Sequence, residues 1–148
     1  MISGPTVSPG YVNDSDERLD NGQFRTGDLG HINDTGRLHV TGRRSDRIVS
    51  GGVSVDATAI AGMLAEHDTV ERAAVVGVPD TTWGERVCAA IVTEERIAPE
   101  QIVDDLAEHF TPAERPREVR SVDRLPRTAS GTVDTQAVRA LFVSDTEE

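Results

Sequence analysis

The segment Val70-Glu71-Arg72-Ala73-Ala74-Val75-Val76-Gly77-Val78 decides the fold that the sequence predicts. Its apolar centre, Ala73 to Val76, is typical of a buried strand, which Pro79-Asp80 should end. Residues 87–93 form the next predicted strand. The only cysteine, Cys88, lies in the apolar part of that strand, so we expect a small core residue rather than a nucleophile.

Further elements are predicted on both sides of these two strands. Apolar residues at helical spacing, preceded by a capping aspartate or a proline, indicate helices. The predicted elements are a hairpin around Ser50-Gly51-Gly52, a helix over 57–66 capped by Asp56, a helix over 99–110 starting at Pro99, a short strand over 118–122, and a helix over 135–142 capped by Asp134. We therefore expect an α+β fold, with helices packed on a short sheet.

The first part of the chain is predicted to be β-rich. Turn signals divide residues 1–43 into short segments, among them Asn21-Gly22 and Thr35-Gly36. Because this part has few residues for a core of its own, we expect it to belong to a larger neighbour. The predicted organisation is a β-rich lead over 1–43, a small domain over 44–143 and an acidic tail over 144–148.

Composition excludes several classes of protein. The 148 residues carry a net charge of −11, which argues against nucleic-acid binding. One cysteine permits neither an internal disulfide nor a multi-cysteine zinc site, and we expect no metal site. No apolar run approaches the length of a membrane span, and the first residues lack a charged-then-apolar pattern, so we expect neither a membrane span nor a secretory signal. All 15 basic residues are arginine, which a GC-rich genome alone would favour, but which together with the negative charge predicts a cytoplasmic protein adapted to high salt.

Three polar segments are candidates for a site. Asp28 follows a glycine turn and could accept hydrogen bonds from a ribose diol, or could bind its own backbone as turn aspartates do. Arg43, beside Gly42, could contact a phosphate or ribose, or could be a solvated surface charge. The loop 128–132 could present N–H groups to an anion, although Asp134 opposes this, or could be an ordinary loop. The four histidines are expected to be ordinary surface or half-buried residues.

Six segments occur in a specific order along the chain: Phe24-Arg25-Thr26-Gly27-Asp28-Leu29-Gly30, Gly42-Arg43-Arg44-Ser45-Asp46-Arg47-Ile48, Ser50-Gly51-Gly52, Gly77-Val78-Pro79-Asp80, Trp83-Gly84-Glu85 and Leu125-Pro126-Arg127-Thr128-Ala129-Ser130-Gly131. Together they resemble the AMP-forming acyl-CoA synthetase and adenylating-enzyme superfamily, including acyl-CoA and o-succinylbenzoate-CoA ligases. The resemblance covers residues 3–142 but matches only the C-terminal part of such an enzyme. Residues 1–43 would then be the end of the large N-terminal domain.

The resemblance implies a two-step reaction and a role for several residues. A carboxylate attacks the α-phosphate of Mg-ATP, and a thiol, usually that of coenzyme A, then displaces AMP. The resemblance implies that Asp28 holds the ribose hydroxyls, that Arg43 contacts the ribose or phosphate, and that Ser45 is the hinge between the two steps. It also implies that Ser50, Gly51 and Gly52 line the coenzyme A tunnel, where a backbone without Cβ can lie close to the thiol.

The chain departs from the family pattern at the position that matters most for adenylation. The family has a catalytic lysine after Ser-Gly, where this chain has Thr132. The carboxylates of the family helix after the hairpin are replaced by alanines, and Ser45 replaces an aspartate or lysine. We therefore expect slow adenylation and no tightly bound cofactor.

Two functions remain open at this point, with a decayed gene product as a third reading. The first is that the chain is the C-terminal part of an acyl-CoA ligase, inactive without an N-terminal AMP-binding domain in cis or in trans. Alternatively, it is a non-catalytic domain that binds a nucleotide, coenzyme A or a partner synthetase. The sequence does not identify the carboxylic acid substrate.

Overall fold

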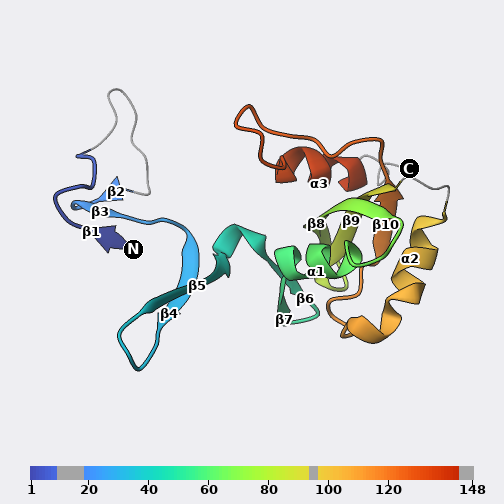
Figure 1. Ribbon diagram of the computed structural model, residues 1–148, viewed down its shortest axis with the longest axis horizontal. Coiled ribbons are helices and arrows are strands. Elements are labelled where there is room, and N and C mark those ends of the chain that lie inside the picture. The colour runs from blue at the N-terminus through green and yellow to red at the C-terminus, as the bar shows by residue number, and fades with distance from the viewer. Residues whose placement is uncertain (10–18, 94–96, 144–148) are drawn as a thin grey trace. The chain divides into compact units, whose positions relative to one another are not determined.

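The computed structural model describes residues 1–9, 19–93 and 97–143, which form two compact units, Met1–Ser45 and Asp46–Glu148 (Figure 1). We refer to them as unit 1 and unit 2 and describe each by itself. The predicted acidic tail lies outside the described residues.

Unit 1 contains two small antiparallel sheets. The first has the strand order β1 (Ile2–Ser3), β3 (Gln23–Phe24), β2 (Leu19–Asp20). The predicted turn at Asn21-Gly22 joins β2 to β3. Its two residues have positive φ angles of 50° and 73°, as a tight hairpin turn of the primed type requires.

The second sheet of unit 1 is a hairpin of β4 (Asp28–Ile32) and β5 (Leu38–Arg43). The side chain of Asn33 shapes its turn, because Oδ1 accepts hydrogen bonds from the backbone N–H groups of Thr35 (3.1 Å) and Arg37 (2.9 Å). The imidazole rings of His31 and His39 stack across the two strands, with their centroids 5.4 Å apart. The sequence alone did not predict this histidine pair.

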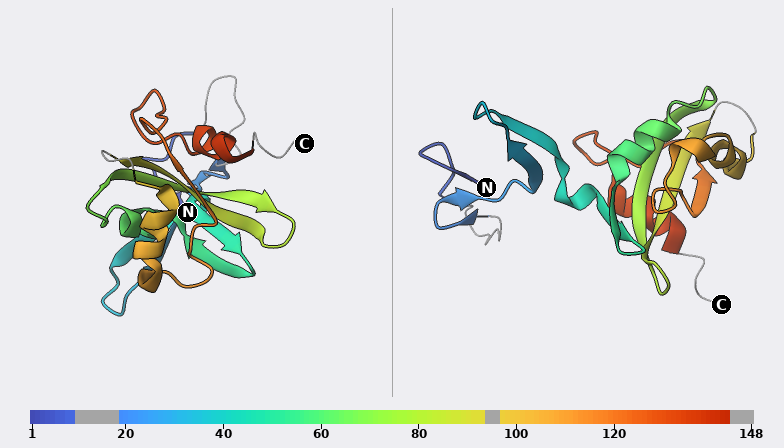
Figure 2. Two further views of the ribbon diagram at one scale, coloured as in Figure 1. Left: turned by 90° about the vertical axis from the view of Figure 1, so that its right-hand side faces the viewer. Right: turned by 90° about the horizontal axis from the view of Figure 1, so that it is seen from below.

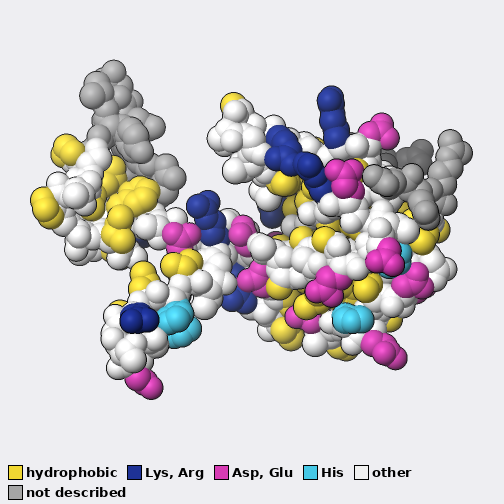
Figure 3. Space-filling model, viewed as in Figure 1, with side chains coloured by type: hydrophobic (Ala, Val, Ile, Leu, Met, Phe, Trp, Pro, Cys, Tyr) yellow, Lys and Arg dark blue, Asp and Glu magenta, His cyan; other side chains and the backbone are white. Residues whose placement is uncertain are grey.

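One face of the β4–β5 hairpin is apolar and open to solvent. Ile32 and Leu38 are directly opposite each other, and Val40 lies opposite Gly30. The three apolar residues are 63–70% exposed. Figure 3 shows apolar side chains at the surface of unit 1. A two-stranded sheet is at best marginally stable alone in water, so this face is suited to being covered by further protein.

Unit 2 is built on a five-stranded sheet. Its central strand, β9 (Gly84–Thr93), pairs antiparallel with β8 (Val70–Asp80) along its whole length. On its other side β9 pairs in parallel with β10 (Glu118–Ser121), and at Gly84 with the end of β6 (Arg47–Ser50), which forms a hairpin with β7 (Val53–Asp56). The predicted α+β fold is confirmed.

The prediction that Pro79-Asp80 ends the first long strand is wrong. β8 continues through both residues, and Pro79 pairs with Glu85. In the described sheet β8 pairs only with β9 and is therefore an edge strand. Edge strands tolerate proline, because one side of such a strand makes no ladder hydrogen bonds.

Three helices pack on the sheet: α1 (Ala57–Leu64), α2 (Pro99–Asp105) and α3 (Thr135–Val143). The Asp56 carboxylate caps α1 as predicted, accepting hydrogen bonds from Thr58 N (2.9 Å) and Ala59 N (3.2 Å). The predicted helix over 99–110 is shorter than expected. The backbone leaves the α-helical conformation at Leu106 and forms a 3-10 turn over 107–109, after which Phe110 is extended and buried.

The sheet of unit 2 is covered on both faces (Figure 2). Residues of α1 and α2, including Ile60 and Ile102, pack with Val87 and Ile91 in the larger core. On the opposite face, residues of α3, including Phe142, pack with Cys88 in a second core. This double burial explains why β8 and β9 are apolar at successive positions rather than at alternate ones.

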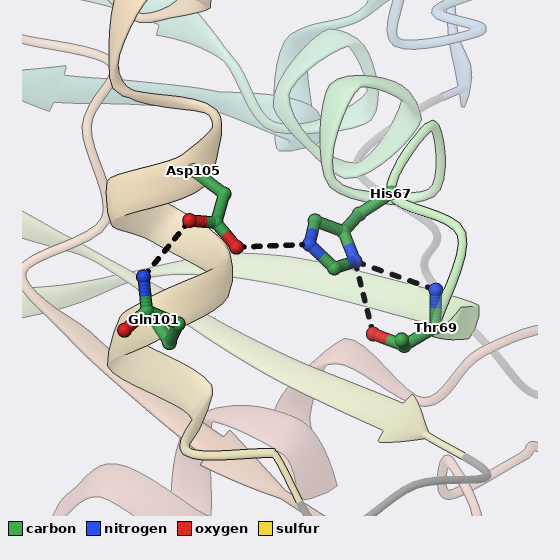
Figure 4. Close-up of polar contacts among 4 residues, drawn as sticks. All are labelled: His67, Thr69, Gln101 and Asp105. Carbon is green, nitrogen blue, oxygen red and sulfur yellow. Dashed lines mark hydrogen bonds and ion pairs between the residues drawn. The ribbon is translucent and has the colours of Figure 1, made fainter.

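A polar contact joins the turn after α1 to α2 (Figure 4). His67 Nε2 lies 3.3 Å from Asp105 Oδ2, and Thr69 Oγ1 lies 2.9 Å from His67 Nδ1. The other oxygen of Asp105 accepts a hydrogen bond of 2.8 Å from Gln101. The hydrogen bond from Gln101, followed by that from His67, lowers the pKa of Asp105 below its ordinary value of 3.8. These contacts fix α2 relative to the start of β8.

Candidate functional site

The predicted nucleotide-binding residues Asp28 and Arg43 are brought together in unit 1. They are opposite each other in the β4–β5 register, and Arg43 Nε lies 3.3 Å from Asp28 Oδ1. Both side chains remain accessible, at 34% for Asp28 and 69% for Arg43. The Asp28 carboxylate therefore contacts a guanidinium and keeps lone pairs free for hydroxyl donors.

The predicted hinge residue, Ser45, lies at the boundary between the units. Unit 1 ends at Ser45 and unit 2 begins at Asp46. The backbone forms a 3-10 turn over Arg44–Asp46, and Arg44 N donates a hydrogen bond of 2.8 Å to Gly27 O in unit 1. Ser45 is exposed.

The glycines predicted to line a tunnel form the tip of the β6–β7 hairpin in unit 2. Gly51 and Gly52 have φ angles of 59° and 80°, which favour glycine, and Ser50 is 1% exposed. A methyl group on Gly52 would meet open space. A methyl group on Gly51 would lie 2.9 Å from Trp83 Cε3, so glycine is required there on two grounds.

The β8–β9 turn holds the hairpin tip. Gly51 N donates a hydrogen bond of 2.9 Å to Trp83 O, and Ser50 pairs with Gly84. Glu85 Oε2 accepts a hydrogen bond of 2.9 Å from Val49 N. These contacts with the β8–β9 hairpin fix the position of the tip.

Sequence reasoning gave no role to Trp83 or Arg117, although both contribute to this part of the molecule. The Arg117 guanidinium carbon lies 4.1 Å from the centroid of the Trp83 ring, which is a cation–π contact. The available signal was the single tryptophan next to the turn residues after Asp80. Arg117 has no local signal because it comes from the segment before β10.

The lysine-position residue, Thr132, lies in an exposed loop closed by hydrogen bonds. Thr128 N donates to Thr132 O (2.8 Å) and Gly131 N donates to Thr128 O (2.9 Å). Thr132 Oγ1 lies 2.8 Å from Thr128 Oγ1 and 3.5 Å from Ser130 Oγ. The Thr132 side chain is thus part of a cluster of hydroxyl groups and carries no charge.

The N-terminus of α3, which follows this loop, is already occupied. Asp134 Oδ1 accepts hydrogen bonds from Gln136 N (3.1 Å) and Ala137 N (3.0 Å). A negative charge at this position disfavours an external anion, so the helix N-terminus is not a phosphate site.

The described part of the chain contains no group of three or more His, Cys, Asp and Glu side chains placed to hold a metal ion. None of the helices within residues 1–9, 19–93 and 97–143 is long and apolar enough to span a membrane.

Comparison with known proteins assigns a family to this arrangement. The family model of the AMP-binding enzyme C-terminal domain matches residues 59–132. Among curated proteins, a 2-succinylbenzoate–CoA ligase of Listeria monocytogenes is 32% identical over 142 residues, which are 94% of this chain and 30% of the relative. A ligase of the same name from Geobacillus is 37% identical over 135 residues, covering 88% of this chain and 27% of the relative.

Solved structures show the same relationship. The o-succinylbenzoate CoA synthetase of Bacillus subtilis, solved with its acyl-adenylate intermediate, matches 93% of this chain and 29% of its own, with a TM-score of 0.78 and 31% identity. ATP-bound MatB of Rhodopseudomonas palustris matches 85% of this chain and 25% of its own, with a TM-score of 0.74 and 34% identity. The chain therefore spans less than a third of the length of the relatives that it matches.

Proposed function

Since the chain belongs to the family of AMP-binding enzyme C-terminal domains, we propose that it is the C-terminal part of an ATP-dependent, AMP-forming acid–CoA ligase. In such a ligase a carboxylate oxygen attacks the α-phosphorus of Mg-ATP, and pyrophosphate leaves. The thiol of coenzyme A then attacks the acyl carbon of the adenylate, and AMP leaves. The carboxylic acid substrate and the protein region that binds it lie outside this chain.

The division of the chain at Ser45 is the observation that best supports this proposal. The Asp28–Arg43 pair belongs to unit 1, whereas the glycine tip and the Thr132 loop belong to unit 2. A hinge at Ser45 lets unit 2 bring the loop to the reacting groups in the first step and the tip in the second. One chain thereby serves two reactions that need different surroundings.

The Asp28–Arg43 pair is suited to the nucleotide. A carboxylate with free lone pairs accepts hydrogen bonds from the two ribose hydroxyls, and an accessible guanidinium donates to phosphate or ribose oxygens. Their mutual contact holds both side chains in place before the nucleotide arrives. The magnesium ion would come with ATP.

The hairpin tip is suited to the thiol arm of coenzyme A. Gly52 leaves open space beside the backbone, and Gly51 lies against the ring of Trp83. Arg117, above the same ring, adds a positive charge next to the tip, where the phosphates of coenzyme A need one. Carriers other than coenzyme A also present a thiol, and the tip does not distinguish between them.

The apolar face of unit 1 supports a requirement for an N-terminal AMP-binding domain, in cis or in trans. Ile32, Leu38 and Val40 present their side chains to solvent on one side of a two-stranded sheet. Covering them removes apolar area from water, which stabilises the hairpin at about 25 cal/mol per Å². The chain alone is therefore expected to be inactive.

Thr132 supports the second candidate, a non-catalytic domain that binds a nucleotide, coenzyme A or a partner synthetase. Loss of a preorganised charge lowers the rate of adenylation by a factor on the order of 10²–10³.

The arginine-only basicity and the net charge of −11 support a cytoplasm of high salt concentration as the location of the protein.

The test is to join the full chain to the N-terminal region of the Bacillus subtilis synthetase, in place of the matching C-terminal region. We expect thioester formation from preformed acyl-adenylate, and a tenfold or greater gain in ATP–pyrophosphate exchange on Thr132→Lys. Gly52→Val, which fills the open space at the tip, should reduce the thioester step and leave exchange unchanged. A folded hybrid that forms no thioester would favour the non-catalytic candidate.

A further inference from the structure

The loop at the family's lysine position contains a cation at another residue. Arg127 is exposed and stands directly before the hydroxyl cluster, at the other end of the loop from Thr132. Its backbone pairs with Val133 in an isolated antiparallel bridge. Its guanidinium reaches over the loop, where Nη1 donates a hydrogen bond of 2.5 Å to Gly131 O. The guanidinium thus contacts the peptide group that joins Gly131 to Thr132.

No carboxylate of the described residues neutralises this charge. Several other arginines of the chain are in ion pairs, for example Arg43 with Asp28 and Arg115 with Asp104. Arg127 contacts a carbonyl oxygen instead. The first acid after Arg127 in the chain, Asp134, caps α3 with its carboxylate. Arginine side chains gather on the side of unit 2 that carries α3, to which the loop leads (Figure 3).

We propose that Arg127 is a catalytic residue of the adenylation step and supplies the positive charge that Thr132 lacks. This inference rests on the proposed function of the chain. In the step, a carboxylate oxygen bonds to the α-phosphorus, and the bond from that phosphorus to the bridging oxygen breaks. Pyrophosphate leaves with the electron pair. The Arg127 guanidinium stays protonated throughout and donates hydrogen bonds to the carboxylate and α-phosphate oxygens.

The chemistry of arginine fits this role. A guanidinium has five N–H donors, of which the contact with Gly131 O uses one. The remaining donors form a planar fork that matches two oxygens of a carboxylate or phosphate group. The contact with Gly131 also limits the freedom of the long side chain, which reduces the entropy lost when it binds the reacting groups.

The test uses the full chain joined to the Bacillus subtilis N-terminal region, with both half-reactions measured. Arg127→Ala should reduce ATP–pyrophosphate exchange about 100-fold and leave thioester formation from acyl-adenylate within twofold. Arg127→Lys should retain part of the exchange rate, because it keeps the charge and loses the fork. Arg124→Ala, which removes another exposed arginine three positions earlier, is the matched control and should change exchange less than threefold.

A double-mutant cycle separates charge from loop shape. Thr132→Lys places a cation at the neighbouring position, so Arg127→Ala should cost less than fivefold in that background. If Arg127 only shapes the loop, its removal will cost the same in both backgrounds, which overturns the inference. Unchanged exchange in Arg127→Ala also overturns it. Loss of thioester formation in the unsubstituted hybrid would instead count against the proposed function.

Discussion

Gly51 lies where the two hairpins of unit 2 meet. The family resemblance implied a glycine requirement there, because the backbone would lie close to a thiol channel. The structure adds a requirement that is internal to the fold, since the Trp83 ring occupies the space of a side chain at Gly51. Gly52, with a similar φ angle, has no such neighbour. The two adjacent glycines therefore separate the effect of backbone conformation from the effect of packing.

We predict that Gly52→Ala costs about 1 kcal/mol of unfolding free energy, from the left-handed backbone conformation alone. Gly51→Ala should cost about 1–3 kcal/mol more, because its methyl group must displace Trp83. Urea denaturation of both variants, followed by tryptophan fluorescence, measures the difference. Equal losses in the two variants would contradict the packing argument.

Thr132 illustrates what single residues do and do not reveal. Its identity predicted directly that the charge of the family's lysine is missing, because a threonine side chain carries no charge at neutral pH. Its surroundings could not be predicted, since the hydroxyl cluster and the position of Arg127 depend on how the loop closes. A residue-by-residue comparison with a family finds what is lost, whereas only the folded loop shows a neighbouring charge.

At the scale of elements, the β8–β9 turn determines where the hairpin tip lies. Asp80 Oδ1 accepts hydrogen bonds from Thr82 N (2.8 Å) and Trp83 N (2.9 Å). The hydrogen bond from Trp83 N, followed by that from Thr82 N, lowers the pKa of Asp80 below its ordinary value of 3.8. The ionised carboxylate thereby orders the turn from which Trp83 contacts Gly51.

Acid should weaken this turn as the pH falls below the ordinary pKa of an aspartate. Because the folded state lowers the Asp80 pKa, the stabilisation is complete above pH 3.8 and is lost as the pH falls through the folded-state value. Asp80→Asn cannot ionise, so its stability should fall less between pH 5 and pH 3 than that of the unsubstituted chain. Urea midpoints across this range provide the measurement, and parallel pH profiles would refute the assignment.

Most elements could be predicted from the sequence, and the errors have local causes. Helical spacing and capping residues located α1 and α3 to within two residues. The same spacing overestimated α2, because Leu106 and Phe110 are buried without a continuous helix between them. Pro79, which the sequence predicts as the end of β8, lies within it, because an edge strand accommodates proline.

At the scale of the whole molecule, charge dominates the composition. A net charge of −11 on 148 residues repels itself, and the repulsion weakens as salt shortens the screening length. No lysine is present to offset the acidic residues, and several of the arginines are held in ion pairs. Folding is therefore expected to depend on ionic strength.

We predict that raising KCl from about 0.01 M to about 1 M shortens the screening length from roughly 30 Å to roughly 3 Å and stabilises the chain. A gain of about 1 kcal/mol corresponds to a rise in Tm of roughly 4 °C for a chain of this size. Melting followed by circular dichroism measures the shift. Full folding with an unchanged Tm in dilute buffer would remove the argument for adaptation to high salt.

The domain-scale prediction depended on resemblance more than on physics. Apolar periodicity identified a sheet with helices but gave no means of placing Arg117 beside Trp83. It also could not place Ile32 opposite Leu38, since the pairing of the two strands depends on where the turn between them closes. Contacts between distant segments are fixed by packing, which a linear pattern does not contain.

The double burial of β8 and β9 has a consequence for how the chain reaches its fold. These strands are adjacent in sequence and joined by a short turn, so they can pair early, before α3 and β10 have been synthesised. The early hairpin would expose the apolar face that α3 later covers, which includes Cys88, whereas α1 precedes β8 and can already cover part of the other face. Such exposed faces associate readily with one another. Charged residues flank the apolar stretches, Glu71 and Arg72 before the first and Glu85 and Arg86 before the second. Charges in such positions oppose the association of apolar strands, so we expect them to limit contact between nascent chains until the helices dock.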